Sequence, residues 1–169
     1  MRNKVIAKAG VAAAIFGCCG AAMAQGPNPT GLSARVGIFL PTSDVGSSTW
    51  YAFGIDYKLN SLPASVPGSG MAAYWGLSAD YYAWGGDTNV PVVINYNLKS
   101  GPLTYSLGAG IDFFNVPDFN DGSGTGFDLQ AGVGYQFGMG PLPFFLQAKY
   151  FLASRDHLRG FGIYAGIHF

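Results

Sequence analysis

The last ten residues of the chain alternate between apolar side chains and residues of other kinds. Phe161, Ile163, Ala165, Ile167 and Phe169 fall on one face of an extended ribbon. A terminal strand with one fully apolar face needs that face covered or immersed, because an exposed apolar edge promotes aggregation. A closed barrel in a lipid bilayer meets this requirement, since lipid covers the face and closure removes the edge.

Seven earlier segments show the same period of two, with turn residues between them. The eight segments are Leu32–Leu40, Trp50–Leu59, Met71–Trp84, Val92–Lys99, Leu103–Phe114, Thr125–Phe137, Leu142–Leu152 and Arg159–Phe169. No helical period of comparable length follows residue 24. The sequence therefore predicts an all-β fold: an eight-stranded antiparallel up-and-down transmembrane barrel over residues 32–169, whose first and last segments pair.

The start of the chain is typical of a secretory signal peptide. Basic residues precede the apolar run Ala9–Cys19, and Ala22–Ala24 forms a small-x-small cleavage site. We expect residues 1–24 to be removed and residues 25–31 to form a short lead-in. A competing interpretation makes Ile15–Cys18 a lipoprotein box, although Phe16 is bulky for that motif. Both cysteines lie in the signal segment, so the remaining chain has no thiol chemistry.

Away from the ends of the predicted strands, the charged residues all lie opposite the aliphatic face. They are Arg35, Asp56, Lys58, Asp80, Lys99, Asp112, Asp128 and Lys149, and His168 shares their face. A lysine or arginine facing lipid at the bilayer midplane costs about 2–4 kcal/mol, so the aliphatic face is predicted to meet lipid. The interior of an eight-stranded barrel is just wide enough to be filled by side chains. Four basic and four acidic residues therefore predict a plugged, charge-balanced interior held by ion pairs.

Strand direction sorts this interior network by depth. We expect Arg35, Asp56, Lys58, Lys99 and His168 towards the periplasmic end, and Asp80, Asp112, Asp128 and Lys149 towards the outer end. His168 is expected to be a packed hydrogen-bonding partner near Ser33 and Arg35. The connections within Ser100–Pro102 and Gly138–Pro141 are short, as in periplasmic turns, whereas Asn115–Gly124 is longer and polar.

In a soluble eight-stranded barrel such as a lipocalin, the same alternation would place the apolar residues in the lumen and the charged residues on the surface that faces water. Charged residues make up only 11% of the chain, against about 25% in an average soluble domain. Eight charges on eight strands are too sparse a coat for a soluble surface, and the first strand lacks the Gly-x-Trp motif typical of lipocalins. The membrane interpretation is therefore favoured.

The terminal strand resembles the carboxy-terminal assembly signal of bacterial outer-membrane barrels, with Tyr164, Ile167 and Phe169 as its signal residues. With its eight segments, the chain resembles small outer-membrane barrels of the OmpA/OmpX type. This resemblance implies export through the periplasm, recognition by the barrel-assembly machinery, residence in the outer membrane of a diderm bacterium, and a monomer. No basic tract suggests a nucleic-acid partner.

Candidate chemistry is sparse. Ser154, Asp156 and His157 invite a nucleophilic triad, but in an extended loop His157 projects away from the other two. Eight-stranded lipid A deacylases use His, Ser and Glu, and this chain has no glutamate. Oxygens of Asp118–Gly122, with Asp128 nearby, could attract Ca²⁺, but their spacing does not match an EF-hand. We expect no catalytic, cofactor or metal site.

The leading functional interpretation is a non-enzymatic outer-membrane barrel with a structural role or a role exerted through its outer loops. One alternative is a narrow channel for small or apolar solutes. A second alternative is an enzyme that modifies outer-membrane lipids. Because this type of fold hosts many activities, the fold does not choose among them.

Overall fold

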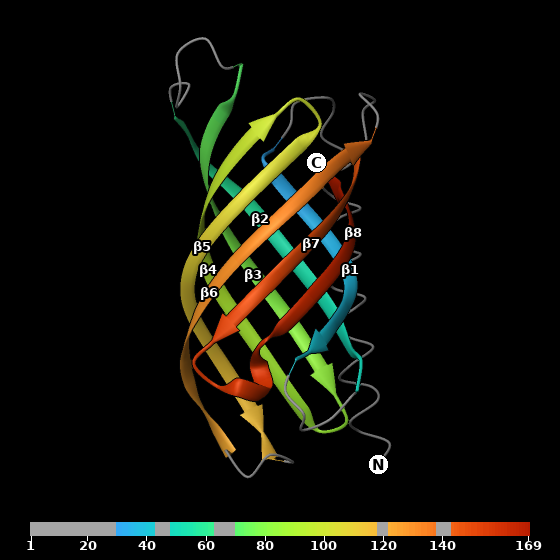
Figure 1. Ribbon diagram of the computed structural model, residues 1–169, viewed down its shortest axis with the longest axis vertical. Helices are drawn as coiled ribbons and strands as arrows, with labels where there is room; N and C mark the ends of the chain where they lie inside the picture. Colours follow the sequence, from blue (N-terminus) through green and yellow to red (C-terminus); the bar gives the residue numbers. More distant parts are fainter. Residues whose placement is uncertain (1–29, 43–47, 63–69, 118–121, 138–142) are drawn as a thin grey trace.

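The computed structural model describes residues 30–42, 48–62, 70–117, 122–137 and 143–169. Eight strands form a closed antiparallel barrel in sequence order, as predicted (Figure 1). They are β1 (Leu32–Pro41), β2 (Trp50–Leu62), β3 (Ala72–Trp84), β4 (Asp87–Ser100), β5 (Leu103–Val116), β6 (Gly122–Phe137), β7 (Phe144–Ala153) and β8 (Gly160–His168). The predicted signal peptide, residues 1–24, lies outside the described residues. No helix among the described residues is long and apolar enough to cross a bilayer.

The alternation seen in the sequence becomes an alternation of exposure along each strand. In β5, Ser106 and Asp112 are buried, whereas Leu107 and Ile111 are exposed. A period of two places successive side chains on opposite faces, so each strand sends one set into the lumen and the other outward. The exterior is therefore apolar and the lumen polar along most of its length.

Pairing of β1 with β8 closes the barrel in the predicted antiparallel register. Ser33 lies opposite His168, and Pro41 lies opposite Gly160. The Ser33 Oγ and His168 Nδ1 atoms are 2.6 Å apart, within hydrogen-bond distance. The Phe169 N–H also donates to the Leu32 carbonyl at 2.8 Å. The predicted proximity of His168 to Ser33 is confirmed.

Several strands extend beyond their predicted ends, β4 and β2 among them. β4 begins at Asp87 rather than Val92, because Gly85 and Gly86 form a two-residue turn in which Gly85 has a φ of 57°. β2 continues to Leu62 rather than Leu59 through a register shift between Lys58 and Asn60, which shortens the connection to β3.

The barrel has two distinct ends. We call the end where β1 begins and β8 finishes the terminal end, and the opposite end the loop end. In Figure 1 the terminal end is uppermost and carries the C-terminus. The short 3-10 helix η2 (Asp156–Leu158) lies between β7 and β8 at the loop end. The predicted tight connection after β4 is confirmed as the two-residue turn Gly101–Pro102 at the terminal end.

Closure makes a specific prediction for the last two residues. Replacing Phe169 with Asp should reduce the amount of assembled barrel, because it places a charge beside the seam where an apolar residue belongs. Replacing His168 with Ala should leave assembly largely intact, because a typical hydrogen bond contributes only about 0.5–1.5 kcal/mol. Heat-modifiable gel migration of outer-membrane fractions measures both. Equal assembly of the two variants would contradict this account.

Candidate functional site in the barrel lumen

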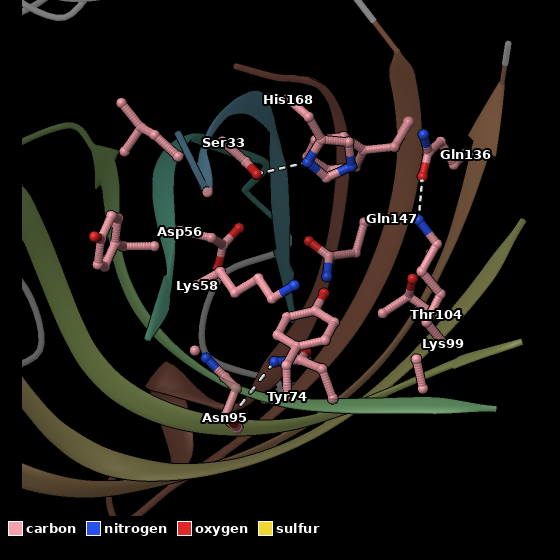
Figure 2. A pocket seen from close by; sticks show the side chains of 18 of the residues that line it. Ser33, Asp56, Lys58, Tyr74, Asn95, Lys99, Thr104, Gln136, Gln147 and His168 are labelled. Carbon is pink, nitrogen blue, oxygen red and sulfur yellow. Dashed lines mark hydrogen bonds between the residues drawn. The ribbon is translucent and has the colours of Figure 1, made fainter. Parts of the chain in front are cut away.

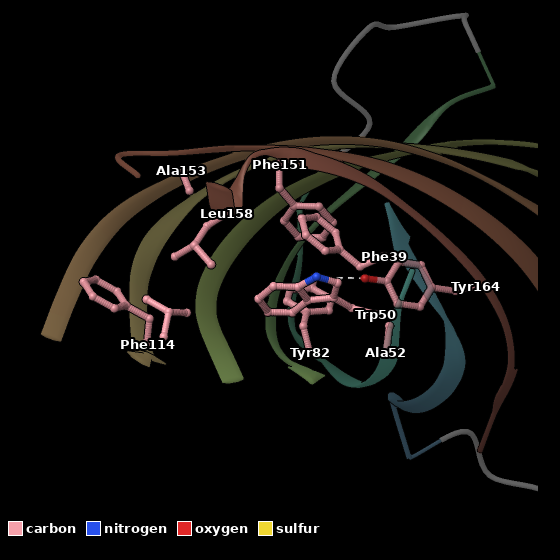
Figure 3. Close-up of a cluster of buried hydrophobic side chains, with 10 residues drawn as sticks. Phe39, Trp50, Ala52, Tyr82, Phe114, Phe151, Ala153, Leu158 and Tyr164 are labelled. Carbon is pink, nitrogen blue, oxygen red and sulfur yellow. Dashed lines mark hydrogen bonds between the residues drawn. The ribbon is translucent and has the colours of Figure 1, made fainter. Parts of the chain in front are cut away.

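The lumen contains three layers along the barrel axis. An aromatic layer occupies the loop end, a charged layer the middle, and a cavity the terminal end (Figures 2 and 3). The charged layer is built on Asp80, the cavity is bordered by Lys58 and Lys99, and the aromatic layer is centred on Phe39. Residues distant in sequence meet because neighbouring strands tilt around a common axis.

Asp80 on β3 joins two buried cations in the charged layer. Arg35 on β1 donates to Asp80 Oδ1 from Nε at 3.0 Å and from Nη2 at 2.7 Å. Lys149 on β7 approaches Asp80 Oδ2 from the other side, with its Nζ at 3.4 Å. Arg35 also forms an ion pair with Asp56, whose side chain is 30% exposed. A buried cation needs such partners, because an unpaired charge in a lumen of low dielectric costs several kcal/mol.

An amide and hydroxyl network continues the polar layer towards the opposite wall. Asn95 Nδ2 donates to Ser78 Oγ at 2.8 Å, and Gln130 Nε2 donates to the same oxygen at 3.2 Å. Gln130 also donates to the Asn95 side-chain oxygen. Gln130 Oε1 lies 3.4 Å from Lys149 Nζ, which connects this network to the charged layer. The network bridges β3, β4 and β6 across the lumen and satisfies groups that water cannot reach.

Asp112 and Asp128 are buried without cationic hydrogen-bond donors. Asn89 Nδ2 donates to Asp112 Oδ1 at 3.3 Å, and neither oxygen of Asp128 has a hydrogen-bond partner among the described residues. Lys58 and Lys99 line the cavity at the terminal end, which is the depth predicted for them. The balanced number of charges therefore does not give Asp112 and Asp128 a cationic hydrogen-bond donor among the described residues.

Sequence reasoning missed two lumen residues, Asp87 and Asn89. Both are buried, with exposed fractions of 2% and 3%. They were assigned to a loop because Asp87–Asn89 is polar and follows two glycines. Their spacing of two residues, continued by Pro91 and Val93, was the signal that they extend the inward face of β4.

The aromatic layer fills the loop end of the lumen. Phe39 stacks on Tyr82 with ring centroids 4.8 Å apart, and Phe151 meets both rings edge to face. Trp50 meets Phe39 edge to face at 6.0 Å. The Tyr164 hydroxyl donates to that of Tyr82 at 2.9 Å, the bond drawn in Figure 3. Such pairs add about 0.5–1.5 kcal/mol each beyond the burial of area.

Residues near η2 complete this end and occupy the position where a triad was considered. Leu158 of η2 is 2% exposed and belongs to the aromatic layer. Ser154 Oγ accepts a hydrogen bond from the Phe127 N–H at 3.1 Å, and Asp156 pairs with Arg159 at 2.7 Å. The serine and the aspartate thus have separate structural partners. The candidate Ca²⁺ loop lies mostly at 118–121, outside the described residues.

The cavity at the terminal end has a volume of about 370 Å³. Lys99 Nζ donates to Gln136 Oε1 at 2.8 Å, and Lys58 Nζ lies 5.2 Å from the Tyr74 ring centroid (Figure 2). His168 stacks on Phe145 with ring centroids 4.5 Å apart. The cavity is therefore bordered by cations, amides and aromatic rings.

The predicted assembly-signal residues occupy different positions. Tyr164 faces the lumen with an exposed fraction of 1%, and the Arg35 guanidinium lies 5.1 Å from its ring centroid. Ile167 lies opposite Ala34 and Phe144 on the two neighbouring strands. Phe169 lines the cavity, and its carbonyl accepts from the Thr30 N–H at 2.8 Å. Their role as a signal stays a prediction.

The exterior carries large apolar side chains around the whole barrel. Exposed aliphatic residues include Val36, Ile55, Leu77, Ile94, Leu107, Val133, Leu146 and Ile163. Exposed aromatic residues include Tyr57, Tyr105 and Phe137 towards the terminal end, and Tyr51, Phe113, Phe127 and Phe161 towards the loop end. Aromatic girdles on both sides of an apolar band are the exterior of a membrane-spanning barrel. The chain forms a transmembrane barrel of the outer-membrane type.

Comparisons with known proteins find similarity only in structure. No protein-family model matches the chain. No curated protein matches it. It is similar to the crystal structure of the outer membrane enzyme PagL, with 19% identity, coverage of 81% of this chain and 96% of that chain, and a TM-score of 0.49. It is also similar to the Yersinia pestis outer membrane protein Ail in a phospholipid nanodisc, with 14% identity, coverage of 82% and 98%, and a TM-score of 0.45. A fold does not bring an activity with it, so the lumen residues have to carry the functional argument.

The absence of a side chain at Gly54 is required by the charged layer. Gly54 lies opposite Arg35, and a Cβ there would overlap the Asp80 carboxylate and lie 2.7 Å from Arg35 Nε. Replacing Gly54 with Ala should therefore lower the free energy of unfolding by about 1–3 kcal/mol. The matched control is Gly134→Ala, where the nearest heavy atom lies 3.5 Å away. Urea titration of the barrel folded in lipid vesicles measures the difference, and equal losses would contradict the proposed packing.

The charged layer also predicts opposite outcomes for two buried aspartates. Asp80→Asn should destabilise the barrel by about 3–5 kcal/mol, because it leaves Arg35 and Lys149 without their shared anion. Asp128→Asn should unfold at the same or a higher urea concentration, because it removes a buried charge that has no hydrogen-bond donor among the described residues. The same urea titration compares them. A loss in Asp128→Asn as large as in Asp80→Asn would refute this assignment.

Proposed function

We propose that the chain is a non-enzymatic outer-membrane barrel with a closed lumen, whose role is structural or is exerted from the residues at its loop end. The observation that carries the proposal is the aromatic layer. Phe39, Trp50, Tyr82 and Phe151 are each no more than 2% exposed and contact one another across the lumen. A water-filled path for ions would have to pass through these rings.

The charged layer, which lies next to the aromatic layer on its terminal-end side, also supports a closed lumen. Asp80 joins cations from β1 and β7, and the Asn95–Ser78–Gln130 network connects three further positions on the wall. Interiors of larger barrels that conduct are water-filled, whereas the interior of an eight-stranded barrel is just wide enough for side chains to fill or for one small ligand. A lumen filled in this way favours rigidity over transport.

The non-enzymatic part of the proposal rests on the loop end. Ser154 is bound to the β6 backbone, and Asp156 is paired with Arg159. A nucleophilic serine needs a base within hydrogen-bond reach and a third group to orient that base. Among the described residues, no group of three or more His, Cys, Asp or Glu side chains is arranged to hold a metal ion.

A narrow channel is the second candidate function, and the terminal-end cavity is the observation that favours it. The cavity already opens about 370 Å³ of the lumen, so only the charged and aromatic layers separate it from the loop end. A channel of this kind would need both layers to rearrange together.

Conductance in planar lipid bilayers tests the closed lumen. The parent barrel should show no steady conductance at the nanosiemens level. Removing two rings and one buried cation with Phe39→Ala, Phe151→Ala and Lys149→Ala should produce one, because the aromatic layer then loses its central contacts and the charged layer loses its link to β7. The matched control, Phe113→Ala with Phe127→Ala, removes two rings from the exterior and should stay silent. Steady conductance of the parent would overturn the closed lumen and favour the channel.

A further inference from the structure

The terminal-end cavity is a large space that the lumen side chains leave open. Its wall includes residues from β1 to β8, and it lies between the charged layer and the terminal end, on the side away from the aromatic rings. At about 370 Å³ it falls within the range of small-molecule sites. We propose that it binds a small aromatic anion, with Lys58 and Lys99 holding the anionic group. This site is additional to the closed lumen and does not require it.

The charge of the cavity wall is the first observation that favours an anionic ligand. Lys58 on β2 and Lys99 on β4 direct their ammonium groups into the space from different sides (Figure 2). Neither forms an ion pair with a carboxylate among the described residues, since Lys99 donates to the neutral Gln136 and Lys58 lies over the Tyr74 ring. Asp56, the acidic side chain lining the cavity, is occupied by Arg35. Two ammonium groups therefore line the cavity without a carboxylate paired to either of them among the described residues.

The connections at this end do not supply the missing counter-charge. Residues 63–69 and 138–142 join strands at the terminal end, and their sequences contain no aspartate or glutamate. The terminal carboxylate of Phe169, which also lines the cavity, accepts hydrogen bonds from the N–H and hydroxyl of Thr30 and is not paired with Lys58 or Lys99. Two ammonium groups in a recess gain most from an anion that enters it, because the recess shields them from bulk water.

Aromatic walls define the body of the ligand. Phe145 is buried and stacked on His168, and Tyr74 lies on the opposite side of the space from it. Tyr135 and Leu32 add apolar surface to the lining. Binding sites for small molecules combine such apolar walls with a few polar groups that fix orientation. A planar ring attached to the anionic group matches this lining better than a compact inorganic ion.

A buried hydrogen-bond acceptor in the cavity lining has no donor, and this specifies one more feature of the ligand. Gln147 Oε1 is buried, lies in the cavity lining, and has no hydrogen-bond donor among the described residues. An unsatisfied buried acceptor is unfavourable, and a small movement of the Gln147 side chain into the cavity would bring this oxygen to a ligand hydroxyl. The preferred ligand therefore carries a hydroxyl on its ring as well as a carboxylate or phosphate.

The test is a titration of the full mature chain in lipid nanodiscs, followed by NMR shifts of cavity and loop-end amides. The probes are 4-hydroxybenzoate, benzoate, benzylamine and inorganic phosphate. We expect 4-hydroxybenzoate to bind several-fold more tightly than benzoate, with shifts confined to the cavity residues. Benzylamine, which carries the opposite charge, should not bind, and inorganic phosphate should bind more weakly than either carboxylate.

Three variants separate the contributions. Lys58→Gln with Lys99→Gln should weaken 4-hydroxybenzoate binding by roughly tenfold or more, because two charge-assisted contacts are lost. Lys58→Arg with Lys99→Arg should restore most of it. Gln147→Leu should abolish the preference for 4-hydroxybenzoate over benzoate. The matched control for charge is Arg155→Gln at the exposed loop end, which should bind like the parent.

Heat-modifiable gel migration establishes that each variant is folded. If the double variant does not assemble, the single variants Lys58→Gln and Lys99→Gln replace it in the titration. The proposal is overturned if removing the lysine charges leaves the affinity unchanged, if benzylamine binds as well as benzoate, or if the shifts map to the loop end. It is also overturned if inorganic phosphate binds as tightly as 4-hydroxybenzoate, because the aromatic walls would then contribute nothing.

Discussion

The rest of the structure depends on the requirement that no backbone hydrogen-bonding group remain unpaired in lipid. Hydrocarbon offers no donors or acceptors, so a sheet can cross a bilayer only when its first and last strands pair. Here β1 and β8 meet over the run from Ser33–His168 to Pro41–Gly160. Once eight strands close, the radius of the lumen is set, and every inward side chain has to fit the remaining space.

That limited space explains how large and small residues alternate inside. Glycines lie beside large inward side chains, because a glycine has no side chain and the neighbouring large side chain fills the space it leaves. Gly162 accommodates the Tyr164 ring, Gly54 accommodates the Arg35–Asp80 contact, and Gly166 accommodates Phe145. The result is a lumen in which ions, amides and rings separate into layers instead of mixing. Most polar groups of the layers are satisfied; among the described residues, buried atoms without a hydrogen-bond partner include Trp50 Nε1, Asn89 Oδ1, Asp112 Oδ2, both carboxylate oxygens of Asp128 and Gln147 Oε1.

The strand number, the inward and outward faces and the closing register follow from the sequence because each is a local consequence of a period of two. Asp87 and Asn89 escaped the same reasoning, because a polar stretch after Gly85–Gly86 matches a loop as well as a strand. Pairing across the lumen could not be predicted in full either. Strand direction predicts that Lys58 and Lys99 lie towards the terminal end, as they do, but the equal numbers of acids and bases do not show which acids are left without a cationic donor. The cavity depends on distances between side chains of different strands, so no pattern in the sequence predicts it.

The Asp80 ion pairs have a consequence for the order in which the barrel forms. Their two cations come from β1 and β7, which stand at one edge and near the other edge of the sheet before it closes. In an open sheet Arg35 and Asp80 already lie on either side of Gly54, whereas Lys149 on β7 is far from both. Lys149 reaches Asp80 only as β8 reaches β1, so the step that pairs the backbone of the two edge strands also completes the charged layer.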